Sequence, residues 1–246
     1  MGEKGKFEEE SLSDEEDRLD SIATNSVYAL GILTESVRFG YGVFSRFINP
    51  WDKVLELGPA EGLGTEILHQ MVSDLTVVDG SKHFCQELES KFPDVKVVNN
   101  LFEEFTPGVQ FDVIICAHVL EHVEHPGMLL RSIRRWLRPG GKLIAAVPNA
   151  NSIHRQTAVR MGLLQVNSEL NATDLRQGHR RVYNPEGFRK EICGEEFDLE
   201  VFAGYWLKPL SNAQIDADWS PAMNEAFFAL GEEYPEIAAE IYIVAT

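Results

Sequence analysis

The sequence predicts an α/β fold built around one doubly wound, mostly parallel sheet. From residue 51 onward, short β-branched runs bounded by turn residues alternate with segments of helical periodicity. The predicted buried strands are residues 53–57, 75–78, 95–98, 113–116 and 143–147. The predicted helices between them are residues 65–72, 82–91 and 126–137. Strands that alternate with helices form a parallel sheet with right-handed crossovers.

Two helices are predicted before the sheet. Ser13 and Glu16 form a capping-box pattern ahead of apolar residues at helical spacing, which predicts a helix over residues 14–27. An aromatic stretch predicts a second helix over residues 39–48, which must end before Pro50 because a residue that precedes proline avoids the helical region.

The C-terminal part completes the sheet and carries two insertions. Asn184-Pro185 is a helix start, and residues 197–205 and 239–245 are predicted strands. The segments 149–184 and 207–238 are too long for plain connections, and we expect them to be functional lids at the ligand-facing edge of the sheet.

Size and charge limit the class of protein. The chain has 246 residues, enough for one domain with a full core. Its net charge of −17 disfavours a nucleic-acid partner. Its apolar runs are far shorter than the roughly 20 residues that span a bilayer, and residues 1–10 are acidic, so we expect a cytoplasmic protein without a membrane partner. The cysteines are expected to be reduced core thiols: Cys85, Cys116 and Cys193.

The most specific motif is a glycine-rich turn between a strand and a helix. It reads Glu56-Leu-Gly58-Pro59-Ala60-Glu-Gly62-Leu-Gly64, so backbone can approach a ligand closely. A dinucleotide fingerprint would need glycine at positions 58, 60 and 63. The chain has Ala60 and Leu63 instead, which argues against a nicotinamide oxidoreductase. The carboxylate of Glu56, at the strand tip, suits a ligand that carries positive charge.

A second acidic residue follows the next strand. Asp79 lies 21 residues beyond Gly58, where a carboxylate can accept both hydroxyls of a ribose, so the ligand is expected to be a nucleoside. The alternative is that Asp79 only caps the helix that begins near Ser81.

Two further motifs complete a pattern that resembles class I S-adenosylmethionine-dependent methyltransferases. They are Phe-Asp-Val-Ile-Ile-Cys-Ala-His-Val-Leu-Glu-His-Val at residues 111–123 and Leu-Arg-Pro-Gly-Gly-Lys-Leu at residues 137–143. The resemblance runs from about residue 51 to 147. It implies a Rossmann-like, seven-stranded sheet whose last strand is antiparallel, with S-adenosylmethionine as cofactor and S-adenosylhomocysteine as product. Ala60 and Leu101 depart from the pattern, which more often has glycine and aspartate there.

The chain is expected to form one domain, residues 1–246, whose segments have different roles. Residues 51–148 form the cofactor-binding core, residues 1–50 a tail and helical lid, and residues 185–206 and 239–246 complete the sheet. The insertions 149–184 and 207–238 cover the acceptor. The implied cofactor contacts are Glu56, Gly58, Pro59, Ala60, Gly62, Asp79, Gly80, Leu101, Phe102, Ala117 and His118.

Histidines at the end of the fourth strand are the candidate catalytic groups. His118 and His122 are each a possible general base, because imidazole is largely neutral near pH 7. Either could instead have a structural role. No metal is expected, although His118, Glu121 and His122 have the i, i+3, i+4 spacing that could hold a divalent cation.

The first insertion is basic although the chain is acidic. Seven arginines and lysines lie between residues 154 and 190, against three acidic residues, which favours an anionic acceptor; the alternative is a solvated face paired with surplus carboxylates. The candidate acceptor-binding residues are His154, Arg155, His179, Arg180, Arg181, Tyr183 and Lys208.

Within the resemblance, Leu-Glu-His-Val and Gly-His-Arg-Arg-Val-Tyr look like the branch that includes ubiquinone-type O-methyltransferases and tailoring enzymes of natural-product and glycan pathways. We therefore expect O-methylation of a small-molecule or peptide acceptor that carries negative charge. N-methylation of a natural-product or sugar amine is one alternative, and a non-catalytic S-adenosylmethionine-binding regulator is another. The sequence leaves the oligomeric state open.

Overall fold

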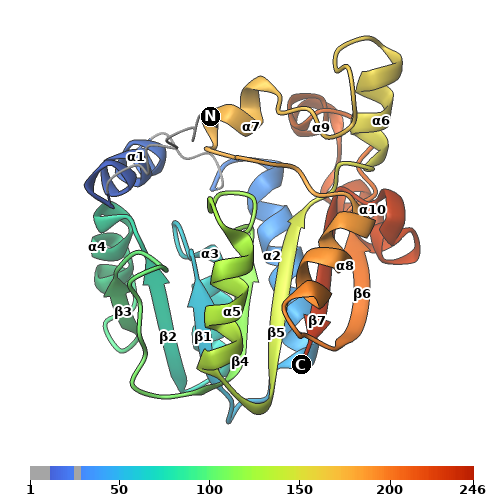
Figure 1. Cartoon of the computed structure of the whole chain (residues 1–246). Helices are drawn as coiled ribbons and strands as arrows, with labels where there is room; N and C mark the ends of the chain where they lie inside the picture. Colours follow the sequence, from blue (N-terminus) through green and yellow to red (C-terminus); the bar gives the residue numbers. More distant parts are fainter. Residues whose placement is uncertain (1–11, 25–28) are drawn as a thin grey trace, which may run out of the picture.

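The structure is a computed structural model that describes residues 12–24 and 29–246. Its centre is a seven-stranded sheet of order β3-β2-β1-β4-β5-β7-β6 (Figure 1). The strands are β1 Lys53–Leu57, β2 Asp74–Asp79, β3 Lys96–Asn99, β4 Phe111–Ala117, β5 Leu137–Pro148, β6 Leu199–Tyr205 and β7 Glu240–Ala245. Strands β1 to β5 pair in parallel, whereas β7 is antiparallel to both β5 and β6. The predicted fold class, including the antiparallel last strand, is confirmed.

The predicted strands all form, with small differences at their ends. The largest difference is β5, which begins at Leu137 rather than at residue 143. Leu137 pairs with Phe111 at the start of β4, so the segment around Gly140 and Gly141 continues the ladder across a register shift.

Helices cover both faces of the sheet, as buried parallel strands require (Figure 1). Apolar residues of α5 and α8 pack with one side of β4 and β5, and those of α2, α3 and α10 pack with the other side. The helices are α1 Leu12–Thr24, α2 Ile32–Phe44, α3 Leu63–Met71, α4 Lys82–Lys91, α5 Pro126–Trp136, α6 Ile153–Arg160, α7 Ala172–Arg176, α8 Pro185–Gly194, α9 Asn212–Asp218 and α10 Pro221–Glu233, with short 3-10 helices at Ser45–Phe47 and Pro235–Ile237.

The N-terminal helices differ from the expected ones in their extent. Helix α2 begins seven residues earlier than expected, at Ile32, because its first turns also bury apolar and small side chains. It gives way to a 3-10 turn that ends before Pro50, as predicted. The end of the first predicted helix at Val27, and the side chains of the expected Ser13 and Glu16 capping box, lie outside the described residues.

The two insertions are placed differently. Figure 1 shows α6, α7 and α9 along the same end of the sheet as α1. Helix α10, from the second insertion, instead packs against β6, where a Cβ on Gly231 would lie 2.1 Å from the backbone nitrogen of Trp206. Only the first part of the second insertion therefore lies where the predicted lid was expected.

Two of the three cysteines are buried thiols, as expected. Cys85 and Cys116 are buried and free, whereas Cys193 is exposed because it lies near the outer end of α8. None of the helices within the described ranges is long and apolar enough to cross a membrane.

Candidate functional site

A first cavity opens at the carboxyl ends of β1, β2 and β4. Its floor is the glycine-rich turn, in which Gly58 has a φ of 63° and donates its N–H to Val78 O at 2.9 Å. A Cβ on Gly58 would lie 2.9 Å from the side chain of Val119, so glycine allows the close approach of two strand ends. The lining residues are Leu19, Ile22, Val37, Tyr41, Gly58, Pro59, Ala60, Glu61, Leu63, Gly64, Asp79, Gly80, Ser81, Phe84, Phe102, Ala117, His118, Val119 and His122.

Asp79 lies in this cavity and is almost fully buried. Its Oδ1 accepts the N–H of Ser81 at 2.8 Å and its Oδ2 accepts the N–H of Ala60 at 3.3 Å. Burial raises the pKa of Asp79 to about 6 although these two N–H donors favour the anion. The cap of α4 is Ser81, whose hydroxyl accepts the N–H of Phe84, so Asp79 is not the helix cap of the alternative interpretation. Each carboxylate oxygen retains acceptor capacity toward the cavity.

Glu56 does not have the position expected of a ligand-binding carboxylate. It is fully buried, does not line the cavity, and accepts hydrogen bonds from Tyr41 Oη and Thr65 Oγ1, both at 2.6 Å. Burial raises the pKa of Glu56 to about 7. Its role in the structure is to join α2 and α3 to the tip of β1, beneath the cavity floor, and this corrects the predicted direct contact.

Two other expected cofactor contacts also lie behind the cavity wall. Gly62, with a φ of 82°, ends the turn and begins α3, while Leu101 is buried next to Phe102, which does line the cavity. A helical lid before the sheet was predicted, but the expected cofactor contacts did not include its residues Leu19 and Ile22, which line the cavity. The pattern of apolar residues gave α1 a buried face without showing which of its side chains reach the cavity.

Helix α1 is held over the first cavity by polar contacts at its middle. Ser81 Oγ donates to Asp20 Oδ1 at 2.6 Å, and the backbone N–H of His83 points at the same oxygen at 3.3 Å. Near the start of the helix, Arg180 Nη2 lies 3.1 Å from Glu15 Oε2. These contacts join α1 to α4 and to the first insertion.

A second cavity, of about 530 Å3, adjoins the first. This volume is in the range of small-molecule sites. Its walls come from α2, the end of β5, α6, α7, α9 and the start of β7, so distant parts of the chain meet here. His118 lines both cavities and thus marks the place where they join.

Strained backbone conformations occur in the walls of both cavities. Among the described residues, the non-glycine residues with positive φ are Ala60 at 48°, His118 at 56°, Trp206 at 66° and Glu196 at 62°. The first three line one or both cavities. Left-handed conformations of non-glycine residues are costly and tend to occur at functional sites. The strain therefore points to the same place as the cavities.

His118 is surrounded by carboxylates. Its Nδ1 lies 3.4 Å from Glu121 Oε1 and 3.9 Å from Glu240 Oε2, and its Nε2 lies 3.4 Å from Tyr205 Oη. Burial lowers the pKa of His118, but Glu121 and Glu240 more than offset this and raise the pKa to about 9. The ring then carries a proton near pH 7. The premise of the general-base prediction, a largely neutral imidazole, does not hold for His118.

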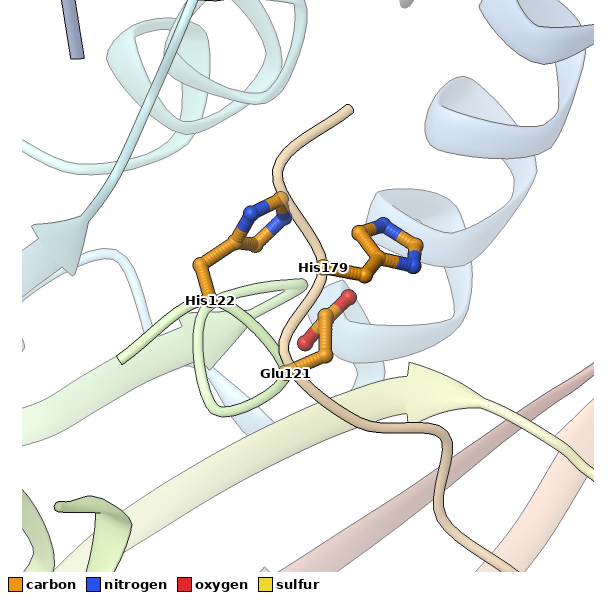
Figure 2. A group of neighbouring side chains, drawn as sticks. All are labelled: Glu121, His122 and His179. Carbon is orange, nitrogen blue, oxygen red and sulfur yellow. The ribbon is translucent and has the colours of Figure 1, made fainter. Parts of the chain in front are cut away.

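The second histidine of the motif belongs to a different group. His122 lines the first cavity, and its ring contacts the ring of His179 edge to face, with 4.7 Å between the centroids. Burial lowers the pKa of His122 to about 4, so the neutral ring is its form near pH 7. Figure 2 shows the Glu121 side chain beside the two rings, below them in this view. The cluster of cation-ligand types therefore consists of Glu121, His122 and His179, and not of the predicted set with His118.

Two arginines of the first insertion that were expected to bind the acceptor donate instead to loop carbonyls. Arg181 Nη1 donates to the carbonyls of Leu120 and Val123 at 2.7 and 2.5 Å, and its Nη2 donates to the carbonyl of Glu124. Arg180 Nε donates to the carbonyl of His122 at 2.9 Å. Neither arginine lines the second cavity. The prediction that they receive an anionic acceptor is therefore replaced by a role in holding the loop after β4.

Arg155 is also occupied, although it lines the second cavity. Its Nη1 lies 3.1 Å from Asp174 Oδ2, and it donates to the carbonyls of Asn167 and Glu169. It fixes the loop between α6 and α7. Tyr183 is buried against Phe188 and pairs with Asn149, away from the cavity wall.

Among the candidate acceptor-binding residues, Lys208 lines the second cavity and can still bind an acceptor there. Its Nζ lies 4.7 Å from the centre of the Trp206 ring, and within the described part of the chain no carboxylate lies within ion-pair distance of it. Burial lowers the pKa of Lys208 to about 8. His154 and His179 line the same cavity.

The fold and the paired cavities define the class of protein. A mostly parallel sheet of this order, a glycine turn after β1 and an acidic residue at the end of β2 form a site for a nucleoside cofactor. A family model described as a methyltransferase domain matches residues 33–203, and the chain belongs to that family. It is an S-adenosylmethionine-dependent methyltransferase of class I, as the resemblance implied.

Similar proteins support the class and differ in the atom that they methylate. A ubiquinone biosynthesis O-methyltransferase of Xanthomonas oryzae pv. oryzae is 28% identical over 65% of this chain and 68% of its own length. An S-adenosylmethionine-dependent methyltransferase from Mesorhizobium loti has a TM-score of 0.61 at 15% identity, over 84% of this chain and 97% of its own. The N-methyltransferase NodS from Bradyrhizobium japonicum WM9, in complex with S-adenosylhomocysteine, has a TM-score of 0.54 at 16% identity, over 87% and 86%.

Proposed function

We propose that this enzyme transfers a methyl group from S-adenosylmethionine to an oxygen atom of a small-molecule acceptor that carries negative charge. The observation that carries the proposal is the junction of the two cavities at His118. A donor in the first cavity and an acceptor in the second can meet only at such an opening. Methyl transfer needs the two reacting atoms in line and about 3 Å apart.

The residues of the first cavity suit the cofactor. Asp79 presents carboxylate oxygens to the ribose hydroxyls, and Phe84 and Phe102 offer aromatic surface for the adenine. Ala60 adopts the left-handed conformation that the turn needs without filling the cavity. When bound, the cofactor supplies an electrophilic methyl group on a sulfonium centre. The chain's part is to hold that group toward His118 and to keep water away.

The residues of the second cavity suit an acidic acceptor. Lys208 is a partly buried cation without a carboxylate partner among the described residues, so an acceptor carboxylate or phosphate would gain a charge-assisted hydrogen bond there. Sequence analysis also predicted an anionic acceptor, but it assigned the anion to arginines of the first insertion. The anionic-acceptor proposal now depends on Lys208 and not on Arg180 or Arg181.

An amine acceptor is the second candidate function. Glu240 lines the second cavity, and its Oε2 is buried without a hydrogen-bond partner among the described residues. This oxygen lies 3.9 Å from His118 Nδ1, close to the junction, where it could accept a hydrogen bond from an ammonium group. The similarity to an N-methyltransferase is consistent with this alternative, at the level of fold.

A radiolabelled transfer assay separates these functions. The acceptor panel would contain hydroxy acids, the neutral amides of the same compounds, and amino analogues with the hydroxyl replaced by an amine. The proposal expects label in the hydroxy acids and little in the neutral amides. Alkaline treatment then distinguishes a methyl ester, which releases the label, from a methyl ether, which does not. Preferential labelling of the amines, with no dependence on the acidic group, would contradict the proposal in favour of N-methylation.

A further inference from the structure

The loop after β4 and the first insertion bring one carboxylate and two imidazoles together. One ligand atom from each of Glu121, His122 and His179 lies within 4.8 Å of the others, and Figure 2 shows the three side chains gathered at the crossing of two chain segments. His122 lines the first cavity and His179 lines the second. The cluster is therefore next to the opening through which the methyl group must pass.

The cluster contains buried polar atoms that its protein neighbours leave unsatisfied. Glu121 is 1% exposed, and neither of its carboxylate oxygens has a hydrogen-bond partner among the described residues. His118 Nδ1 lies 3.4 Å from Oε1, an ion-pair contact that lacks hydrogen-bond alignment. A buried carboxylate in this state costs free energy unless another group binds it.

His179 has the setting of an oriented ligand. It is 7% exposed, and its Nδ1 lies 3.5 Å from Asp174 Oδ1 at the margin of hydrogen-bond distance, which leaves Nε2 for another partner. Asp174 is itself held by Arg155 and by the backbone N–H of Asn171. A carboxylate behind the distal nitrogen of an imidazole is the usual support of a histidine that binds a metal.

We propose that Glu121, His122 and His179 bind one divalent cation of the Zn²⁺ and Co²⁺ type. Two imidazole nitrogens and one carboxylate oxygen suit these cations better than Mg²⁺ or Ca²⁺, which prefer oxygen ligands. Three protein ligands leave coordination positions open, as at catalytic rather than structural sites. Binding of the cation is independent of the proposed function, whereas a role for it beside the acceptor rests on that function.

The proposal replaces the metal set that the local spacing had offered. The i, i+3, i+4 pattern places His118 beside Glu121, but the ligand atoms that gather within 4.8 Å of one another are those of Glu121, His122 and His179. The third ligand comes instead from a residue 57 positions beyond His122, in a different segment of the chain. Only the tertiary structure shows this ligand.

The test is a titration of the full-length, chelator-treated protein with Co²⁺ and Zn²⁺. Visible d–d absorption of Co²⁺ should saturate at one ion per chain, and Zn²⁺ should displace it. The variants Glu121→Gln and His179→Gln should each weaken Co²⁺ binding at least tenfold. The control His69→Gln, which alters another histidine–carboxylate pair outside both cavities, should bind as the parent does. Circular dichroism and S-adenosylhomocysteine titrations would show that the variants are folded.

The outcomes separate this inference from the proposed function. If the parent binds S-adenosylhomocysteine but shows no saturable Co²⁺ or Zn²⁺ binding, or if Glu121→Gln and His179→Gln bind Co²⁺ as the parent does, the metal site is refuted and the transferase proposal stands. If one cation binds through these residues while no acceptor of the panel is methylated, the metal site stands and the proposed acceptor class fails.

Discussion

The first cavity is lined largely by residues that directly follow β1, β2 and β4, whereas the second is lined by α2, both insertions and the start of β7. In a parallel sheet the carboxyl ends of neighbouring strands must meet, so a few short motifs are sufficient to predict the first cavity. The second depends on which side chains of long insertions turn inward. The cofactor can therefore be inferred from local sequence, whereas the acceptor site becomes visible only in the tertiary structure.

The largest effect is expected in the first cavity. Asp79→Ala should weaken binding of S-adenosylhomocysteine by about 1 to 3 kcal/mol, because the ribose loses charge-assisted hydrogen bonds. Isothermal titration calorimetry measures this directly. Asp94→Ala, which removes an exposed acid outside that cavity, is the matched control. Equal affinities for parent and Asp79→Ala would remove the ribose assignment.

A smaller effect, on stability alone, is expected for the basic insertion. Arg181→Ala should lower the free energy of unfolding by about 2 kcal/mol, because three loop carbonyls lose their donor. Arg160→Ala, at an exposed site, should change it little. Thermal or urea unfolding measures both. An Arg181→Ala protein of parental stability with a raised acceptor KM would restore the acceptor-binding role of this arginine.

In the second cavity, replacement of Lys208 should weaken acceptor binding. Lys208→Met should raise the KM of an acidic acceptor about tenfold, or about 1.4 kcal/mol, with unchanged affinity for S-adenosylhomocysteine. Lys190→Met, which changes an exposed lysine of α8, should leave both values unchanged. If the two variants behave alike in steady-state kinetics, the anion is bound elsewhere.

The same lysine predicts a pH dependence. With its pKa lowered to about 8 by burial, and with Glu240, Arg155, Asp174 and Asp216 around it, Lys208 loses its charge as the pH rises through about 8. Affinity for the acidic acceptor should therefore fall severalfold on the alkaline side. The Lys208→Met protein should not show this step in a KM–pH profile. Persistence of the step in that variant would assign it to another group.

The smallest effect concerns the N-terminal lid. Leu19 and Ile22 of α1 line the first cavity, and Asp20 joins the helix to Ser81, so bound cofactor should slow opening of this helix. Hydrogen exchange across Leu12–Thr24, measured with and without S-adenosylhomocysteine, should show added protection. Helix α8, which contributes no residue to either cavity, serves as the internal reference. Identical exchange in α1 with and without ligand would contradict the lid role.

The fold was predictable because its signals are local. Alternating strands and helices, the turn at Gly58 and the helix start at Asn184 all depend on neighbours in sequence. Local signals placed Glu56 correctly at a strand tip but did not show what its side chain binds. Its carboxylate is buried and accepts hydrogen bonds from hydroxyl groups of α2 and α3. Composition likewise showed that the first insertion is basic and could not show that loop carbonyls occupy its arginines.

The ionisation of the histidines could not be predicted from the sequence either. His118 and His122 are four residues apart, yet the pKa of one is raised to about 9 and that of the other is lowered to about 4. The carboxylates of Glu121 and of Glu240, which comes from the last strand, more than offset burial at His118, whereas burial prevails at His122. Only the folded chain brings these groups together.

The proposed function requires that the two cavities form one reaction site, with the opening between them at His118. The crystal structure of the complex with S-adenosylhomocysteine tests it most directly. In that complex, the ribose hydroxyls are expected to lie on the Asp79 carboxylate, and the sulfur to face the opening beside His118 into the second cavity. A ligand whose sulfur is closed off from the second cavity, or whose ribose lies away from Asp79, would contradict it.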